Sequence, residues 1–214
     1  CESARNVACS GARPVAITNC LNFGNPLGPA VYHQLSEAVA GIGDACRALG
    51  TPVSGGNVSL YNETPSGPVY PTPVIGMVGV LEDLERRVPT GFTAAGDEVV
   101  LIGRTREEIG GSEFLSVVHG RVAGRPPEID LDEAARLVDL LVDAARDGLL
   151  HSAHDCSDGG AAIALAEAAL LAAGGPVGLE VRLPDDVAPA AALFGESQNR
   201  VVASCRPTDL DSLV

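Results

Sequence analysis

The 214-residue chain is long enough to bury a core, and its 46% hydrophobic and 20% charged residues exclude a disordered chain. All 14 basic residues are arginines, because the sequence contains no lysine, and 28 acidic residues give a net charge of -14. This balance excludes a simple electrostatic nucleic-acid binder and any lysine nucleophile or Schiff base.

The six cysteines form no CxxC pair, and the sequence shows neither a signal-peptide pattern nor an apolar run of membrane-spanning length. We therefore expect free thiols and a cytoplasmic protein. Both ends predict a fragment of a longer chain. The sequence opens at Cys1 although Met77 is its only methionine, and a helix is expected to begin after Pro207, close to the last residue.

The first part of the chain predicts strand, helix, interrupted strand and strand in that order. Residues 15–20 and 74–81 are apolar runs typical of buried strands. Between them, apolar side chains recur at helical spacing over residues 31–49, and Gly50 stands where a helix C-cap belongs. Residues 51–63 are strand-like with a glycine turn inside.

A domain boundary is expected within residues 82–97, where the apolar pattern is lost. Beyond it we expect strands at 98–103, 177–183 and 200–205 and helices at 130–144 and 159–173. Asp130 and Glu133 have the spacing of a capping box. The alternation favours an α/β sandwich, so the predicted fold class is α/β (α+β).

The segment Ser54-Gly-Gly-Asn-Val-Ser is the strongest candidate for chemistry. Its glycines let the backbone approach a ligand and aim N–H groups at phosphate oxygens. The amide oxygen of Asn57 suits Mg²⁺, and the Ser59 hydroxyl suits a phosphate or a substrate group. The same residues are ordinary hairpin chemistry, so a tight turn is the alternative.

A second candidate is His154-Asp-Cys-Ser-Asp-Gly-Gly, just before the apolar helix expected at 159–173. Such a helix start attracts phosphate, and Asp155 and Asp158 can hold the accompanying Mg²⁺. The alternative is that Asp158 simply caps the helix and Asp155 completes the cap.

A third polar run is Phe194-Gly-Glu-Ser-Gln-Asn-Arg. Arg200 or Gln198 can hold an anion, or Glu196 can pair with Arg200. We expect a surface ion pair between Glu196 and Arg200. The four histidines show no metal-ligand spacing.

Five motifs follow one another along the chain. They are Thr18-Asn-Cys-Leu-Asn-Phe-Gly-Asn-Pro, Gly50-Thr-Pro-Val-Ser-Gly-Gly-Asn-Val-Ser-Leu-Tyr-Asn-Glu, Tyr70-Pro-Thr-Pro-Val, Gly110-Gly-Ser-Glu-Phe-Leu and Ala153-His-Asp-Cys-Ser-Asp-Gly-Gly. In this order they resemble the C-terminal half of the small-type phosphoribosylformylglycinamidine synthases. The resemblance covers essentially the whole chain.

The resemblance implies a parent enzyme of two AIR-synthase-like halves, each with an ATP-binding N-type domain and an α/β C-type domain. Residues 1–89 would be the later part of the second N-type domain, and residues 90–214 a C-type domain truncated at its end. The implied reaction is an ATP-dependent C–N ligation of purine biosynthesis. It converts formylglycinamide ribonucleotide and glutamine-derived ammonia into formylglycinamidine ribonucleotide through an iminophosphate.

The resemblance also implies roles for individual residues. The expected contacts with ATP, Mg²⁺ and substrate are Asn19 and Gly56 for ATP, Asn57 for Mg²⁺ and Ser59 for the substrate. Many relatives carry Asp where this chain has Asn19. Large-type relatives imply an auxiliary nucleotide site at Asp155 and Ser157. The family's catalytic histidine lies in the first half, so no catalytic residue is expected here.

The implied partners are the first half of the same parent chain, a glutaminase subunit and a small bridging subunit, with no nucleic acid or membrane. Without the first half, the isolated fragment is expected to be inactive. One alternative is a non-catalytic scaffold half with a structural nucleotide site. Another is a related ATP-dependent enzyme, such as aminoimidazole ribonucleotide synthetase or selenophosphate synthetase, whose motifs fit less well.

Overall fold

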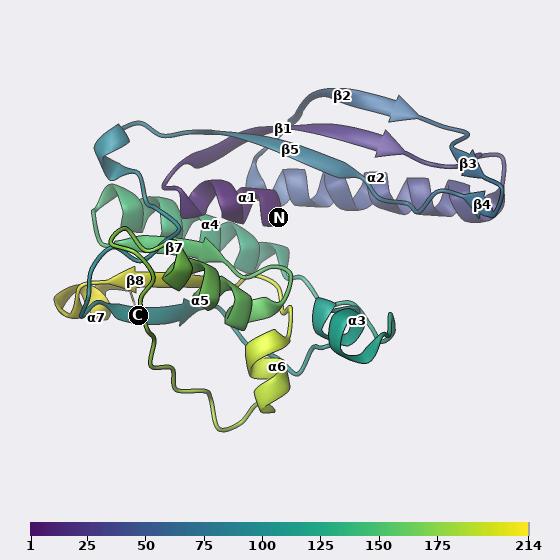
Figure 1. Ribbon diagram of the computed structural model, residues 1–214. Helices are drawn as coiled ribbons and strands as arrows, with labels where there is room; N and C mark the ends of the chain where they lie inside the picture. The colour runs from purple at the N-terminus through teal and green to yellow at the C-terminus, as the bar shows by residue number, and fades with distance from the viewer. Residues whose placement is uncertain (214) are drawn as a thin grey trace. The chain divides into compact units, whose positions relative to one another are not determined.

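The structure is a computed structural model that describes residues 1–213. The chain divides into two compact units. Unit 1 comprises residues 1, 3 and 14–80, and unit 2 comprises residues 2 and 4–13 together with the chain from Leu81 onward. Figure 1 shows the strands and long helix of unit 1 in purple and blue tones, and most of unit 2 in teal, green and yellow.

Unit 1 is built on a three-stranded sheet of order β2-β1-β5, formed by β1 (Arg13–Asn22), β2 (Val53–Ser59) and β5 (Val74–Val80). Strands β1 and β2 are parallel, so their C-terminal ends lie at the same edge of the sheet. A short antiparallel ribbon of β3 (Glu63–Thr64) and β4 (Gly67–Pro68) lies between β2 and β5 in the chain.

Helix α2 (Pro29–Leu49) covers one face of this sheet (Figure 1). Proline suits its first turn because the ring fixes a helical φ and the N–H that it lacks would have no partner there. Gly50 ends the helix at φ 64°, as the sequence predicts, and its N–H donates to Cys46 O. The core of unit 1 joins the end of β1 to α2 through Leu21, Phe23 and Val31, with Leu35, Ala38 and Ile42 packed against them.

Strands β1 and β2 pair with one irregularity. Ile17 pairs with Val53, but Thr18 pairs with Gly55, so Ser54 is an extra residue in β2. The Ser54 hydroxyl donates to Ile17 O at 3.0 Å, which gives that carbonyl a side-chain partner at the bulge. From Thr18 onward the pairing continues without a further shift.

The tight turn considered for residues 54–59 does not form. Both glycines lie inside β2, which continues to Ser59. A parallel neighbour supplies the hydrogen-bond partners that a hairpin would have had to find by folding back on itself.

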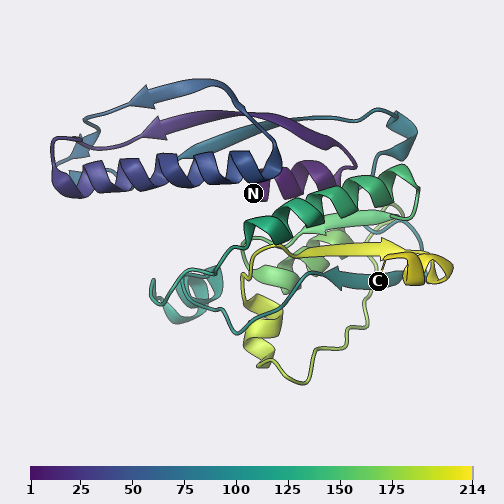
Figure 2. The same cartoon turned by 180° about the vertical axis from the view of Figure 1, so that it is seen from behind.

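Unit 2 contains an antiparallel sheet of order β6-β8-β7, formed by β6 (Glu98–Ile102), β7 (Ser152–Asp155) and β8 (Val201–Cys205). Every residue of the central strand β8 is buried, so both faces of the sheet are covered. Helices α4 (Leu131–Arg146) and α5 (Gly160–Leu170) lie on opposite faces, as Figures 1 and 2 show. Small side chains dominate the core beside α5: Ala161, Ala164, Ala168, Ala169 and Ala172, with Phe92, Cys156 and Val202.

Shorter helices complete unit 2: α1 (Glu2–Cys9), η1 (Leu84–Arg86), α3 (Glu113–His119), α6 (Pro189–Phe194), η2 (Pro207–Asp209) and α7 (Leu210–Leu213).

The predicted cap of α4 is confirmed, since the Asp130 carboxylate accepts the Glu133 N–H at 2.9 Å. This backbone hydrogen bond lowers the pKa of Asp130 below its ordinary value.

The α/β fold class is confirmed, but the strand expected at residues 177–183 is wrong. These residues are extended without a ladder partner, although β6 lies at the edge of its sheet. Val181 and Leu183 instead line a cavity together with Val99 and Leu101 of β6. The alternating apolar pattern therefore lines a cavity beside β6 and does not pair as a strand. Among the described helices, none has both the length and the apolar character needed to cross a membrane.

Candidate functional site

The paired strands β1 and β2 bring four of the expected site residues together. Asn19 is the register partner of Gly56, and Asn57 and Ser59 follow toward the C-terminal end of β2. Ligands of open sheets with parallel strands characteristically bind at the C-terminal ends of those strands. The residues expected for ATP, Mg²⁺ and substrate thus share one short stretch of paired backbone.

Gly56 permits a close approach of the two strands. Its φ of 148° is one that L side chains rarely adopt, and a Cβ atom added there would lie 2.1 Å from Asn19 O and 2.4 Å from Asn19 Oδ1. At Gly55, one residue earlier, an added Cβ would meet nothing within 4 Å. The requirement for glycine at position 56 therefore comes from β1, whereas the sequence alone attributed both glycines to ligand approach.

Alternation along the strands places the candidate side chains on two faces of the sheet. Leu21 packs toward α2, so Asn19, two residues earlier, lies on the α2 face with its partner Gly56. Asn57 and Ser59 occupy the positions of opposite parity and therefore lie on the other face. We call this the open face, because the β5 side chains on it are more than half exposed: Val74, Val78 and Val80.

The residues present fit Mg²⁺ in part. Asn57 is exposed and offers an amide oxygen, the kind of neutral ligand that Mg²⁺ accepts. In the described part of the chain, no three His, Cys, Asp or Glu side chains gather into a group that could hold a metal ion. Mg²⁺ usually keeps several waters and adds phosphate oxygens to few protein ligands. Asn57 therefore fits as one ligand of a hydrated Mg²⁺ on the open face and does not make a metal site by itself.

The second candidate location is built around a buried ion pair in unit 2. Arg5 of α1 donates from Nε to Asp155 Oδ1 at 2.5 Å, and the two side chains are 1% and 2% exposed. The Ser157 hydroxyl donates to the other carboxylate oxygen, Oδ2, at 2.5 Å. Asp155 and Ser157 are thus together, as the sequence predicts, but both oxygens of Asp155 already have partners within the unit.

The start of α5 is not capped by Asp158. Its N-cap residue is Gly159, whose N–H donates to Glu196 Oε1 at 2.9 Å, and the same oxygen accepts the Glu113 N–H at 2.9 Å. One carboxylate therefore serves the starts of α5 and α3. The capping alternative for Asp158 is wrong because a residue 37 positions from Gly159 supplies the acceptor.

The surface ion pair expected between Glu196 and Arg200 is also wrong. Arg200 is 0% exposed, and its guanidinium donates to Ser197 O at 3.0 Å, Thr105 Oγ1 at 3.1 Å and Gly195 O at 2.5 Å. Burial lowers the pKa of Arg200 from its ordinary value, because a charged group loses hydration inside the protein. Arg200 thus braces the loop before β8 from inside the unit.

Two buried thiols lie near the Arg5–Asp155 pair. Burial raises the pKa of Cys156 to about 11 and raises the pKa of Cys9 as well, because a thiolate would be poorly solvated there. Both are free thiols. At neutral pH they are protonated and serve as small apolar core residues.

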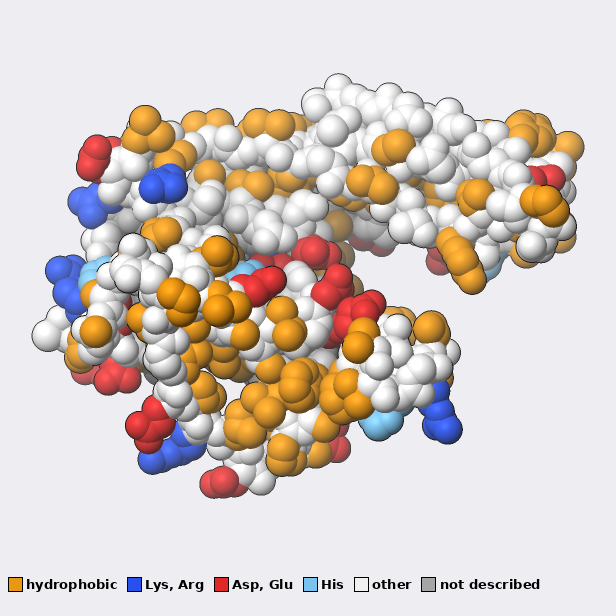
Figure 3. All heavy atoms as spheres, viewed as in Figure 1, with side chains coloured by type: hydrophobic (Ala, Val, Ile, Leu, Met, Phe, Trp, Pro, Cys, Tyr) orange, Lys and Arg blue, Asp and Glu red, His pale blue; other side chains and the backbone are white. Residues whose placement is uncertain are grey.

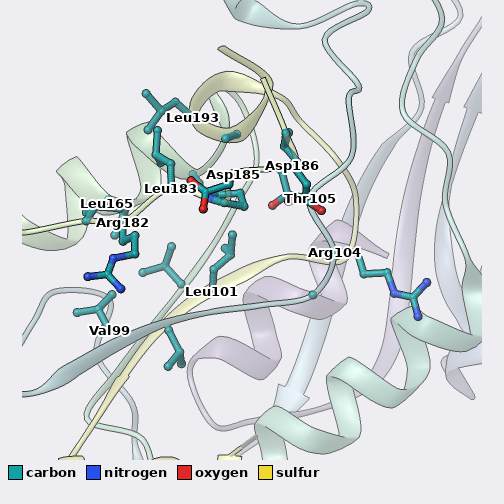
Figure 4. A pocket seen from close by; sticks show the side chains of 18 of the residues that line it. Val99, Leu101, Arg104, Thr105, Leu165, Arg182, Leu183, Asp185, Asp186 and Leu193 are labelled. Atoms are coloured by element: carbon teal, nitrogen blue, oxygen red, sulfur yellow. The ribbon is translucent and has the colours of Figure 1, made fainter. Parts of the chain in front are cut away.

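A cavity of about 960 Å³ lies in unit 2, and none of the candidate residues lines it. Figure 4 shows apolar side chains of β6 and α5 facing Leu183 and Leu193, while Arg104 points away from them. Figure 3 shows hydrophobic side chains gathered over α5 and α6 on the same unit. The cavity is the space between β6 and the extended segment that forms no strand, so we do not assign it a function.

Sequence reasoning missed two residues that contact the candidate side chains. Arg5 binds Asp155 across a sequence separation of 150 residues, and a local sequence pattern cannot predict such a pair. Asn62 contacts Ser59, with 3.2 Å between Nδ2 and Oγ. Asn62 did carry a signal, because it belongs to the same polar motif as Ser59.

Two family models match the chain. The AIR synthase related protein, N-terminal domain, matches residues 1–81, and the AIR synthase related protein, C-terminal domain, matches residues 94–214. The chain belongs to the AIR synthase related family. The N-terminal match contains all of unit 1 and also α1, which packs within unit 2.

Curated relatives carry the name phosphoribosylformylglycinamidine synthase subunit PurL. The protein from Thermobifida fusca (strain YX) is 55% identical over 214 residues, and the protein from Moorella thermoacetica is 53% identical over 213 residues. Both alignments cover 100% of this AIR synthase related chain but only 27% and 29% of the relatives. The resemblance to these synthases is confirmed, and the chain spans little more than a quarter of their length.

Solved structures share the fold. T. maritima PurL complexed with FGAR aligns with a TM-score of 0.72 at 22% identity, covering 98% of this chain and 34% of that one. The hydrogenase maturation protein HypE aligns with a TM-score of 0.67 at 18% identity, covering 99% of this chain and 65% of that one. The AIR synthase related fold thus occurs in differently named proteins, and fold alone does not select among their activities.

Gly56→Ala should destabilise the β1–β2 pair, and Gly55→Ala should not. The added Cβ at position 56 would displace Asn19, at a cost of about 1–3 kcal/mol in unfolding free energy. Chemical denaturation of the longer parent chain, with hydrogen exchange of the β1 and β2 amides, measures the effect. Equal effects of the two substitutions would contradict the close approach at Gly56.

Arg5→Ala and Asp155→Ala should each lower the unfolding free energy of unit 2 by about 3–5 kcal/mol, because each leaves a buried charge without its partner. The matched control is Arg13→Ala, which breaks the Arg13–Asp139 pair of 2.7 Å between side chains that are 48% and 63% exposed. That loss should stay within about 1 kcal/mol. Similar losses of unfolding free energy from both pairs would show that burial of Arg5 and Asp155 does not increase the cost of breaking their ion pair.

Proposed function

We propose that this chain is part of an ATP-dependent C–N ligase of purine biosynthesis. In the parent enzyme, the amide oxygen of formylglycinamide ribonucleotide is phosphorylated to an iminophosphate, and glutamine-derived ammonia then displaces phosphate to give formylglycinamidine ribonucleotide. The observation that carries the proposal is the alignment of the whole chain with PurL relatives at 55% and 53% identity.

The nucleotide is assigned to Asn19 and Gly56. The support is that the two residues are register partners in the paired strands β1 and β2, so one ligand can reach both. T. maritima PurL has been solved in complexes with ATP, ADP and AMPPCP, and its fold is shared with this chain. The neutral Asn19 can accept or donate a hydrogen bond but adds no charge near the phosphates.

Mg²⁺ and substrate are assigned to Asn57 and Ser59 on the open face. Asn57 would supply one oxygen ligand, and Ser59 would hydrogen-bond the substrate. When bound, Mg²⁺ neutralises the developing charge on the phosphate oxygens. The residues of this chain then fix where the metal and the substrate lie along β2.

The lack of lysine limits what this chain can contribute. Its positive potential near a phosphate must come from backbone N–H groups, a bound cation or arginine. We assign any lysine and the catalytic histidine to the first half of the parent chain. In this proposal residues 1–89 belong to the second N-type domain and residues 90–214 to the second C-type domain.

The first half of the parent chain is the proposed partner of the open face. Val74, Val78 and Val80 are 59%, 61% and 52% exposed, so apolar area on this face remains available for burial. A glutaminase subunit and a small bridging subunit would deliver ammonia, and a solved structure of PurLQS from Thermotoga maritima shares the fold. The proposed location is the cytoplasm.

A non-catalytic scaffold half with a structural nucleotide site is the second candidate, and one observation favours the scaffold part of it, a structural role for Asp155 in unit 2. Arg5 and Ser157 already engage both oxygens of Asp155. Asp155 is therefore better suited to hold α1 against β7 than to ligate Mg²⁺. We propose a structural role for this location and a ligand-binding role for the β1–β2 location.

Asn57→Ala in the full-length parent chain should raise the Mg²⁺ concentration needed for ligase activity by at least about tenfold while the protein stays folded. Asn57→Asp should retain activity, because it keeps an oxygen ligand. Val58→Ala is the matched control, since Val58 is the next residue of β2 and is 61% exposed. Steady-state rates across a Mg²⁺ titration measure the effect. Wild-type Mg²⁺ dependence in Asn57→Ala would remove Asn57 from the site.

The isolated chain should show no ligase turnover, because the proposed catalytic histidine lies in the first half of the parent. Phosphate release with formylglycinamide ribonucleotide, ATP and ammonia measures this, and the full-length parent is the positive control. Turnover by the isolated chain would place the complete catalytic machinery within these residues.

A further inference from the structure

We propose that Asn62 is the positioning residue of Ser59, and that it sets Ser59 to accept a hydrogen bond from the substrate. The inference rests on the proposed function, which assigns Ser59 to the substrate. It is carried by contacts at the point where the chain leaves β2.

The Asn62 side chain joins the ends of the two parallel strands. Its Nδ2 donates to Phe23 O, just beyond β1, at 3.1 Å and to Ser59 O, the last residue of β2, at 3.0 Å. Nδ2 lies 3.2 Å and Oδ1 lies 3.4 Å from the Ser59 hydroxyl oxygen. One amide group thus contacts both strand ends and the candidate substrate ligand.

The surroundings fix the orientation of this amide. If Oδ1 and Nδ2 exchanged places, Oδ1 would face the carbonyl oxygens of Phe23 and Ser59, which can only accept hydrogen bonds. The two hydrogens of Nδ2 are therefore committed to these carbonyls. Nδ2 also lies within donor distance of the Ser59 hydroxyl oxygen, at 3.2 Å, and Oδ1, at 3.4 Å, is the acceptor that Asn62 offers to the Ser59 proton.

This arrangement determines what Ser59 offers to a ligand. With its proton given to Asn62 Oδ1, the Ser59 hydroxyl keeps a lone pair with which to accept a hydrogen bond from the substrate. The matching substrate group is a donor, such as an amide N–H or a sugar hydroxyl. A phosphate oxygen, which only accepts, is disfavoured at this position.

The backbone holds Asn62 in place for this task. Tyr61, the residue before it, has φ 62°, a left-handed conformation that non-glycine residues adopt infrequently. The N–H groups of Tyr61 and Asn62 donate to Gly24 O and Phe23 O, each at 3.0 Å. Phe23 is 1% exposed within the core of unit 1. The Asn62 amide is therefore anchored to the buried part of the unit.

A double-mutant cycle in the full-length parent chain, assembled with its partner subunits, tests the inference. Ser59→Ala, Asn62→Ala and the double variant are compared by KM for formylglycinamide ribonucleotide, kcat and thermal midpoint. Each single substitution should raise this KM by about tenfold, the equivalent of one hydrogen bond. In the Ser59→Ala background, Asn62→Ala should add less than about a twofold rise.

The control is Thr64→Val, which removes the hydroxyl that donates to Gly67 O and accepts the Ser66 N–H in the β3–β4 ribbon, without touching Ser59. It should change the thermal midpoint and leave the KM for formylglycinamide ribonucleotide at the wild-type value. If Asn62→Ala does not fold, the same cycle is run with Asn62→Asp. This variant keeps an acceptor for the Ser59 proton, so its KM should lie between those of wild type and Ser59→Ala.

Two outcomes would overturn the inference while leaving the proposed function in place. One is a raised KM in Ser59→Ala with a wild-type KM in folded Asn62→Ala. The other is an Asn62 effect of undiminished size in the Ser59→Ala background. Absence of ligase activity in the wild-type parent would instead refute the proposed function itself.

Discussion

The backbone contact between Gly56 and Asn19 is the constraint on which the candidate site depends. The space that a Cβ would need at Gly56 is taken by Asn19 O at 2.1 Å. This approach holds β1 and β2 in the register that carries Asn57 and Ser59 to the end of β2. Two residues after Asn19, on the same face of β1, Leu21 joins the strand to α2, so the register is supported by the core. In the proposed scheme, the arrangement of the ligand-binding residues thus depends on the absence of a side chain at Gly56.

The lack of lysine limits which side chains can supply a buried positive charge. With 28 acidic residues and no lysine, the chain uses arginine wherever a cation must be buried. Arg5 neutralises Asp155, whereas Arg200 donates only to neutral oxygens of neighbouring loops. A guanidinium tolerates such sites because it stays charged and spreads its donors over several acceptors. Arg200 thus holds the loops before β8 together, and the Nε of Arg5 is committed to Asp155.

Local signals in the sequence were sufficient where the partner atoms lie within a few residues. Gly50 and the Asp130–Glu133 cap are of this kind, and both appear as expected. Signals failed where a distant segment decides the outcome. The same glycines suit a turn or a strand until β1 is present, and residues 177–183 alternate like a strand but find no ladder partner. The residues of the candidate site were reached through the family resemblance, because spacing alone left the turn alternative open.

The bulge at Ser54 determines on which face of the sheet each later side chain of β2 lies. Without that extra residue, Asn57 would pair with Leu21, on the face that packs against α2. Val58 would then pair with Asn22, the position that Ser59 now occupies. A single inserted residue therefore decides which side chains of β2 lie on the open face and which lie on the face toward α2. Sequence comparisons that slide this segment by one position would interchange its polar and apolar faces. The bulge at Ser54 thus sets the pairing register of β2, and this register continues to Ser59, the last residue of the strand.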